Sequence, residues 1–276
     1  MDLQPLGRHH ATIRRLRALR RDPGLRRAAG LFLAEGLHLA QEALRSGARI
    51  ELAVVAPRLA ATDEGREIER RIVECGLTRV EISDAVMESI QDARSPQPIT
   101  LLVHRQEPPP DAGLEGPPQP LVLAAVGVQD PGSLGTLVRT ADAAGATACL
   151  VSEGSADPYH PRAVRATVGS IFRLPVVSRP IAAAIAAMRE HGLTLVGTDP
   201  AAGTAYHRHD YSRSTAIFVG SEGRGLPAAV RAELDELVRV PLRPGVESLS
   251  LAAAAAVVLF EAARQRAASV DQPSVL

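Results

Sequence analysis

Three segments of this sequence have the same order of features: an apolar run of strand length, a turn rich in glycine or proline, and a helical pattern. They are residues 126–146, 216–227 and 240–257. From residue 121 onward, short apolar runs alternate with helical patterns, which is typical of a mostly parallel sheet with helices on both faces. The periodicity therefore predicts an α/β fold of the doubly wound, nucleotide-binding kind.

The first of these segments carries a charged side chain on its helix. An apolar strand at residues 121–128 is followed by residues 130–132, Asp-Pro-Gly, which favour a turn, and Ser133 can cap the helix that comes next. Backbone N–H groups at such a helix start can bind an oxygen-rich ligand. Arg139 lies off the apolar stripe of this helix, which consists of Leu134, Leu137, Val138, Ala141 and Ala144. Taken alone, the segment is more simply interpreted as an ordinary strand, turn and helix with a solvated arginine.

A proline-rich stretch divides the chain into two domains. Residues 107–120 contain six prolines and two glycines and have no apolar periodicity, so we predict a semi-rigid linker there. Before it, residues 1–106 comprise a basic arm and then alternating short strands and helices, which predict a small α/β layer fold. After it, residues 121–266 form the larger domain, and residues 267–276 form a polar tail.

The first 28 residues are rich in arginine and poor in apolar side chains. Ile13, Leu16, Leu19 and Leu25 are too sparse to indicate a core, so we predict a basic helix or arm. It is either a solvated surface, which is the simpler interpretation, or an arm that follows RNA phosphates. The whole chain has 31 basic and 31 acidic residues, so its net charge gives no sign of a nucleic-acid partner.

The remaining polar residues suggest neither a metal site nor an oxidising compartment. Cys75 and Cys149 lie far apart and outside any metal or redox spacing, so we expect two buried thiols in a reducing cytoplasm. His207 and His209 point to opposite sides of an extended chain and have no further ligand nearby, so no metal is expected. No secretory signal and no apolar run of membrane-spanning length is present.

Taken together, the three segments resemble the three signature motifs of the SpoU, or TrmH, family of the SPOUT superfamily. Its members are knotted, S-adenosyl-L-methionine-dependent RNA ribose 2′-O-methyltransferases. Residues 32–103 resemble the substrate-binding domain that often precedes the catalytic domain, with Glu35, Ser83 and Gln97 at expected positions. The resemblance implies a C-terminal trefoil-knotted SPOUT domain, preceded by a smaller α/β RNA-binding domain of the ribosomal-protein type.

The resemblance also implies catalytic roles. Arg139 falls at the position of the catalytic arginine, which contacts the ribose 2′-hydroxyl and the adjoining phosphate. Because a guanidinium is essentially never deprotonated in proteins, we assign it a phosphate clamp that stabilises the developing alkoxide, rather than a general base. Glu222 falls at the acidic position of the second motif, although an exposed loop carboxylate is the plain alternative. Ser133 and Ser250 stand where the family has asparagine, and Ser221 is at a more permissive position.

A cofactor site for S-adenosyl-L-methionine follows from the same resemblance. It places the cofactor against the glycine-rich turn of the second motif, which is neither a P-loop nor a dinucleotide fingerprint, and against an apolar adenine slot in the third. The implied cofactor residues are Gly220, Val240, Leu242, Ser248, Leu249 and Ser250. The predicted helix of residues 248–265 is apolar nearly all round, so we expect a homodimer packed through it.

Three functions are open at this point. The leading one is methyl transfer to a ribose 2′-hydroxyl of ribosomal or transfer RNA, without a metal. The second is an RNA-binding member of the same family that has lost turnover, which the serines at asparagine positions favour. The third is a nucleotide-binding oxidoreductase, against which the missing dinucleotide fingerprint argues. The sequence specifies neither the RNA nor the nucleotide.

Overall fold

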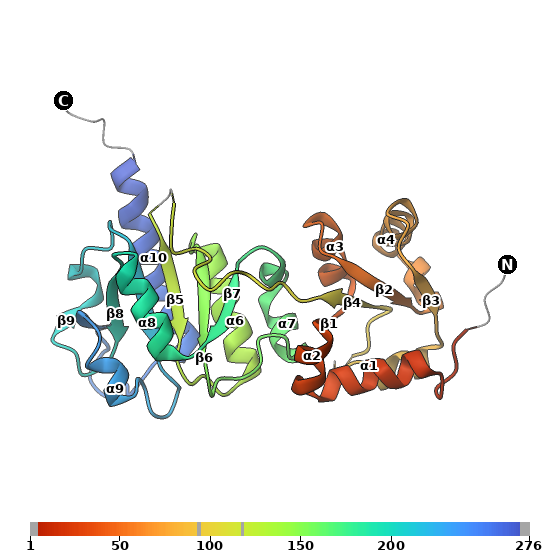
Figure 1. The fold of residues 1–276 in the computed structure, drawn as a ribbon, viewed down its shortest axis with the longest axis horizontal. Coiled ribbons are helices and arrows are strands. Elements are labelled where there is room, and N and C mark those ends of the chain that lie inside the picture. Colours follow the sequence, from red (N-terminus) through yellow and green to blue (C-terminus); the bar gives the residue numbers. More distant parts are fainter. Residues whose placement is uncertain (1–4, 93–94, 117–118, 271–276) are drawn as a thin grey trace. The chain divides into compact units, whose positions relative to one another are not determined.

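The structure is a computed structural model that describes residues 5–92, 95–116 and 119–270. It separates into two compact units, and Figure 1 labels most of their helices and strands. Unit 1 is Met1–Gln106 with Asp157–Arg173, and unit 2 is Glu107–Ala156 with Leu174–Leu276.

Unit 1 is built on a four-stranded sheet with the strand order β1-β4-β2-β3. Strand β4 pairs antiparallel with both β1 and β2, whereas β2 and β3 are parallel. The strands are β1 (Leu31–Glu35), β2 (Ile50–Val55), β3 (Arg79–Glu81) and β4 (Ile99–His104). The helices that join them are α3 (Leu37–Arg45), η1 (Pro57–Ala61), α4 (Asp63–Glu74) and α5 (Asp84–Ile90). The small α/β layer fold predicted for this region is therefore present.

The predicted basic helix is present within residues 5–28, but the prediction that its apolar residues are too sparse for a core is wrong. The segment forms helices α1 (Ala11–Arg21) and α2 (Pro23–Ala29). Ile13, Leu16 and Leu19 are at most 2% exposed and pack into a core cluster with residues of β1, β2, β4 and α5. Three apolar side chains at a spacing of three make a narrow stripe on the helix. Such a stripe is sufficient to form a core when it packs against a sheet.

Unit 1 also contains residues 157–173, which the sequence places between two strands of unit 2. This segment includes α7 (Pro161–Thr167) and the short helix η2 (Ser170–Phe172). Phe32 of β1 packs against Tyr159 and Phe172, with ring centroids 5.0 and 6.0 Å apart. An aromatic cluster therefore holds a late segment of the chain in the unit formed by the early residues.

A buried ion pair joins this segment to α2. Arg26 is 1% exposed, and its Nη2 lies 2.6 Å from Oδ2 of Asp157. Its Nη1 also donates to the backbone oxygens of Leu19 at 2.6 Å and Arg20 at 3.0 Å. A buried charge of this kind is tolerated only while its partner is present.

Replacing Asp157 by alanine is expected to destabilise unit 1. The substitution leaves Arg26 buried without a counter-charge, which destabilises a fold by about 3 kcal/mol or more. The midpoint of urea unfolding, followed by circular dichroism, should fall. Arg27→Ala, at an exposed neighbouring position, is the control and should leave the midpoint in place. An Asp157→Ala midpoint equal to that of the control would contradict a structural role for the pair.

Unit 2 is built on a seven-stranded sheet with the order β7-β6-β5-β10-β8-β11-β9. All six neighbouring pairs are parallel, as the alternation of strands and helices predicts. The trefoil knot that the resemblance implies stays a prediction. The strands are β5 (Leu121–Ala125), β6 (Ala148–Ser152), β7 (Val176–Arg179), β8 (Thr194–Thr198), β9 (Thr204–Ala205), β10 (Thr215–Val219) and β11 (Glu236–Arg239).

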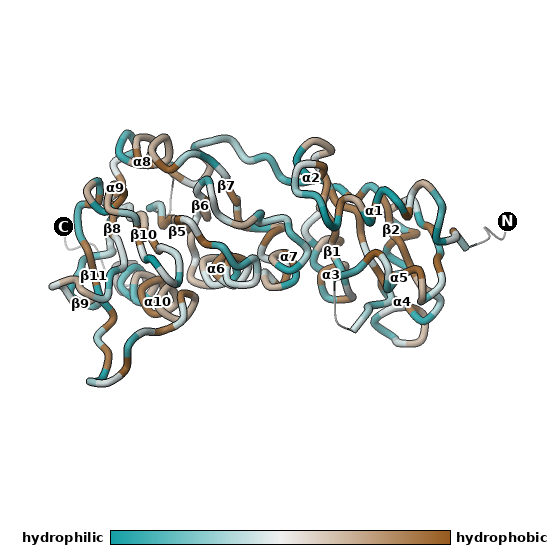
Figure 2. The backbone as a smooth tube through the Cα atoms, turned by 90° about the horizontal axis from the view of Figure 1, so that it is seen from below, coloured by the Kyte–Doolittle hydropathy of each residue, from teal (hydrophilic) through white to brown (hydrophobic). Residues whose placement is uncertain are grey.

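Helices cover both faces of this sheet. Figure 2 shows α8 and α9 along one face and α6 and α10 along the other. The apolar stripe predicted for α6 is buried, and α10 packs against α6 and β10. These helices are α6 (Pro131–Ala143), α8 (Ile181–Glu190), α9 (Ala228–Arg231) and α10 (Leu251–Val270), with the short helix η3 (Tyr206–Arg208) between β9 and β10. Among the helices in the described part of the chain, none has both the length and the apolar character to cross a bilayer.

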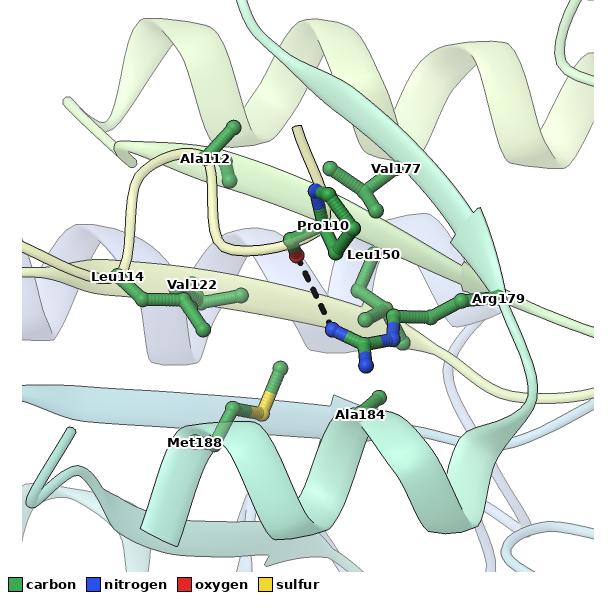
Figure 3. A pocket seen from close by; sticks show the side chains of 10 residues that line it. Pro110, Ala112, Leu114, Val122, Leu150, Val177, Arg179, Ala184 and Met188 are labelled. Carbon is green, nitrogen blue, oxygen red and sulfur yellow. Dashed lines mark hydrogen bonds between the residues drawn. The ribbon is translucent and has the colours of Figure 1, made fainter. Parts of the chain in front are cut away.

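The proline-rich residues 107–120, which we predict to be a linker, belong to unit 2. Leu114 is buried in a hydrophobic core cluster of this unit. Figure 3 shows Pro110 and Leu114 beside side chains of β5, β6 and α8, and Nη1 of Arg179 donates to the backbone oxygen of Pro110 at 3.1 Å. The small cavity there measures about 10 Å³, which is room for a single water molecule. Part of the stretch is therefore packed rather than freely extended.

Candidate functional site

A cavity of about 390 Å³ opens in unit 2 where three parallel strands end. Its walls are formed by the residues that follow β8, the turn after β10, the segment after β11 and the first residues of α10. The carboxyl edge of an open parallel sheet is where α/β folds bind ligands. Five of the predicted cofactor residues line this one cavity, namely Gly220, Val240, Leu242, Ser248 and Leu249.

The turn after β10 is closed by its own backbone. The N–H of Ser221 donates to the oxygen of Gly225 at 3.2 Å, and the N–H of Gly225 donates back to Ser221 at 2.9 Å. A Cβ at position 220 would lie 2.1 Å from the carbonyl carbon of Gly225, so only glycine fits there. Gly220 thus permits a close approach between two parts of the turn, and this approach shapes one wall of the cavity.

A second part of the lining is more apolar and comes from the third motif. Val240 and Leu242 are half-buried, and Leu249 is 39% exposed beside the cavity. Helix α10 begins at Leu251 rather than at the predicted position 248, because Ser250 acts as its N-cap: its Oγ accepts from the N–H of Ala253 at 3.3 Å. Ser250 is not among the cavity-lining residues.

Two charged residues of the cavity lie outside all three motifs. Asp199 follows β8 and is 9% exposed, and its Oδ2 lies 2.8 Å from Nη1 of Arg231. Both residues line the cavity, together with Thr198. The sequence signal that could have identified Asp199 is its place directly after an apolar strand, since the other cavity residues occupy the same kind of position.

The predicted catalytic residues are distributed over two places. Glu222 is exposed in the turn after β10 and lines the cavity. Arg139 is exposed on α6 and has no hydrogen-bond or ion-pair partner among the described residues, so its guanidinium is open to an anionic ligand. Neither Arg139 nor Ser133 lines the cavity. The N-cap of α6 is Asp130, whose Oδ2 accepts from the N–H of Ser133 at 2.8 Å, so the prediction that Ser133 caps this helix is wrong.

The cysteine and histidine residues show no further site. Cys149 is buried, and desolvation raises the pKa of its thiol to about 12, so it is no nucleophile at neutral pH. Cys75 is exposed at the end of α4, contrary to prediction, because the buried face of that helix ends at Ile72. Nδ1 of His209 lies 2.5 Å from a carboxylate oxygen of Glu236. Within the described ranges, no three His, Cys, Asp or Glu residues are grouped so as to hold a metal ion.

Two family models match the chain. The model of the SpoU rRNA Methylase family matches residues 120–260, and that of the MRM3-like substrate binding domain matches residues 10–100. The 23S rRNA (guanosine(2553)-2′-O)-methyltransferase RlmP of Bacillus subtilis is 34% identical over 188 residues, which are 68% of this chain and 73% of that protein. The 23S rRNA (guanosine-2′-O-)-methyltransferase RlmB of Pseudomonas syringae is 39% identical over 155 residues, which are 56% of this chain and 61% of that protein.

Two solved structures with the cofactor bound resemble more than nine-tenths of the chain. The AdoMet-bound rRNA methyltransferase from Sinorhizobium meliloti has a TM-score of 0.80 and 31% identity, covering 92% of this chain and 95% of its own. The SpoU methyltransferase AviRb from Streptomyces viridochromogenes, in complex with AdoMet, has a TM-score of 0.85 and 27% identity. The match covers 94% of this chain and 99% of the AviRb chain.

Proposed function

Since this chain belongs to the SpoU rRNA methylase family, we propose that it transfers a methyl group from S-adenosyl-L-methionine to a ribose 2′-hydroxyl of ribosomal or transfer RNA in the cytoplasm. The observation that carries this proposal is the cavity at the carboxyl edge of the sheet, which brings together residues of the second and third motifs. It is supported by relatives named as 23S rRNA 2′-O-methyltransferases and by similar structures that hold AdoMet.

The cavity fits an adenosyl cofactor in size and in chemistry. Its volume of about 390 Å³ lies within the range of small-molecule sites, which is about 300–1,000 Å³. Val240, Leu242 and Leu249 offer an apolar surface to a purine, while Thr198 and Asp199 offer polar groups. One binding site can therefore take both the adenine and the polar part of the cofactor.

The chemistry required of the protein is limited. When bound, the cofactor supplies a methyl group that its sulfonium already activates, so the protein positions the ribose, stabilises the alkoxide and excludes water. Arg139 can hold the adjoining phosphate through two N–H groups and stabilise the developing negative charge, while the proton leaves to phosphate or water. Its exposed guanidinium without a partner among the described residues suits this role.

We propose that the chain acts as a homodimer packed through α10. Phe260 of this helix is 51% exposed, and Ala256 and Val257 are only half-buried. Because α6 and α10 cover the same face of the sheet (Figure 2), a second copy there would contact the helix that carries Arg139. Sedimentation equilibrium should give twice the chain mass of 29.1 kDa. A monomer at micromolar concentration would contradict the dimer.

Calorimetry on the full chain tests the cofactor assignment. S-adenosyl-L-methionine and its demethylated product S-adenosylhomocysteine should each bind at one site per chain. A nicotinamide dinucleotide, titrated in the same way, should give no heat. Heat with the dinucleotide and none with either adenosyl compound would favour the oxidoreductase instead.

A basic face of α1 is a candidate RNA contact. Arg14, Arg17 and Arg21 recur at helical spacing, away from the buried stripe of the helix. Arg17 is held by Ser89, while Arg14 and Arg21 are exposed and have no partner among the described residues. Two exposed guanidinium groups that are unpaired among the described residues suit contacts with phosphates.

Reversing two of these charges is expected to weaken RNA binding. In the double variant Arg14→Glu/Arg21→Glu, two phosphate contacts are lost. Log affinity falls as log salt concentration rises, and each lost contact should make this fall less steep, by about 0.7–0.9 in slope. Cofactor affinity should not change. A charge reversal is more informative than a deletion because the same helix carries Ile13 and Leu16 of the core. The control is Arg66→Glu on α4; a salt slope equal to that of this control would show that α1 is only a solvated face.

A further inference from the structure

The cavity contains a carboxylate that none of the proposed catalytic steps uses. Asp199 directly follows β8, at the edge of the sheet where the strands that line the cavity end. It is 9% exposed, which is unusual for an acidic side chain. A buried carboxylate in the wall of a cavity needs hydrogen bonds or an ion pair that compensate for its lost hydration.

Three contacts fix the position of Asp199. Its N–H donates to the oxygen of Val238 at 2.9 Å, its Oδ1 accepts from the N–H of Ala201 at 2.7 Å, and its Oδ2 lies 2.8 Å from Nη1 of Arg231. An ionised carboxylate has about four acceptor positions, and the two side-chain contacts occupy two of them. Both carboxylate oxygens therefore keep capacity for donors from the cavity.

The chemistry that suits these free positions is a pair of neighbouring hydroxyl groups. In dinucleotide-binding folds, an acidic residue at the carboxyl end of a parallel strand accepts from ribose hydroxyls. Asp199 occupies a comparable place, in a cavity whose apolar wall, with Val240 and Leu249, suits the attached purine. Arg231 orients the carboxylate through their ion pair, and its side chain is 44% exposed at the same cavity.

We propose that Asp199 binds the ribose diol of the adenosyl cofactor and that Arg231 acts as its positioning residue. This inference rests on the proposed function, because it assumes that an adenosyl compound occupies the cavity. It assigns the ribose of the ligand to a charged pair outside the three motifs, and leaves the adenine at the apolar wall.

Calorimetry with 5′-deoxy-5′-methylthioadenosine tests this assignment, because that compound keeps the adenine and the diol but lacks the amino-acid tail. Asp199→Asn removes one charge-assisted acceptor and should weaken its binding about 10- to 100-fold. The 2′,3′-dideoxy analogue should bind wild type as weakly as it binds Asp199→Asn. Asp235→Asn, the same change at a residue that does not line the cavity, should bind methylthioadenosine like wild type.

Each other outcome overturns the assignment in a recognisable way. If wild type binds the diol and dideoxy compounds with equal affinity, the protein makes no contact with the diol. This comparison uses no variant, so misfolding of a variant cannot produce that result. A loss with S-adenosylhomocysteine alone would assign Asp199 to the amino-acid tail. If wild type binds no adenosyl compound, the cofactor proposal fails as well, whereas loss of diol discrimination alone leaves that proposal standing.

Discussion

Arg139→Lys should lower the rate of methyl transfer about 100- to 1,000-fold and change RNA affinity far less. Lysine keeps the positive charge but replaces a planar fork of five N–H donors by a point charge. The loss of one aligned donor to a developing oxyanion typically lowers turnover by this factor. Single-turnover transfer of a labelled methyl group from S-adenosyl-L-methionine to RNA measures the effect.

The position of Arg139 allows this substitution to change the rate of the reaction without changing the fold. Arg139 is exposed and lies off the buried stripe of α6, so its replacement leaves the packing of the helix unchanged. Arg189→Lys, on the opposite face of the sheet in α8 (Figure 2), is the matched control and should retain full activity. If Arg139→Lys methylates RNA as fast as wild type, the assignment of the catalytic arginine is wrong.

The same assay distinguishes an enzyme from an RNA-binding protein without turnover. Ser133→Asn and Ser250→Asn restore the residues that the family motifs have at these positions. Asparagine is also a good helix N-cap, so α10 should keep the cap that Ser250 provides. In an active enzyme, the double variant should be as fast as wild type or faster. Transfer by the double variant alone would indicate a member that has lost turnover.

Gly220→Ala should weaken cofactor binding about 100-fold or more. The added Cβ would lie 2.1 Å from the carbonyl carbon of Gly225, and no side-chain rotation relieves a contact with backbone. The two hydrogen bonds between Ser221 and Gly225 must then break or lengthen, which deforms the wall of the cavity. Calorimetry with S-adenosylhomocysteine measures the loss.

Gly203→Ala is the control for this prediction. It adds the same methyl group to the same unit, but no atom lies within 4 Å of the added Cβ and the residue does not line the cavity. Its cofactor affinity should equal that of wild type. If Gly220→Ala also binds S-adenosylhomocysteine like wild type, the turn does not shape the cofactor site.

The order of strands and helices could be predicted from the sequence because its signals are local. The apolar runs at residues 121–125 and 215–219 are buried strands. Gly220 follows β10 and Leu249 lies in the segment after β11, and both line one cavity because these strands are parallel and their carboxyl ends lie at the same edge. The resemblance to the family motifs therefore predicted residues that line one cavity, and their contact with the cofactor stays a prediction.

Contacts between distant parts of the chain could not be predicted in this way. Arg26 and Asp157 are 131 positions apart, and neither has a local pattern that indicates burial. The pairing of Asp199 with Arg231 likewise depends on how β8 and α9 pack. A sparse apolar stripe such as that of α1 has meaning only when the surface opposite it is known.

Mapping of ribose methylation tests the central claim most directly. Ribosomal and transfer RNA from cells with and without this protein are digested, and 2′-O-methylated nucleotides are located by mass spectrometry. At least one 2′-O-methyl group should disappear without the protein and return with wild type, but not with Arg139→Lys. Identical methylation maps in the presence and absence of the protein would contradict the proposed function.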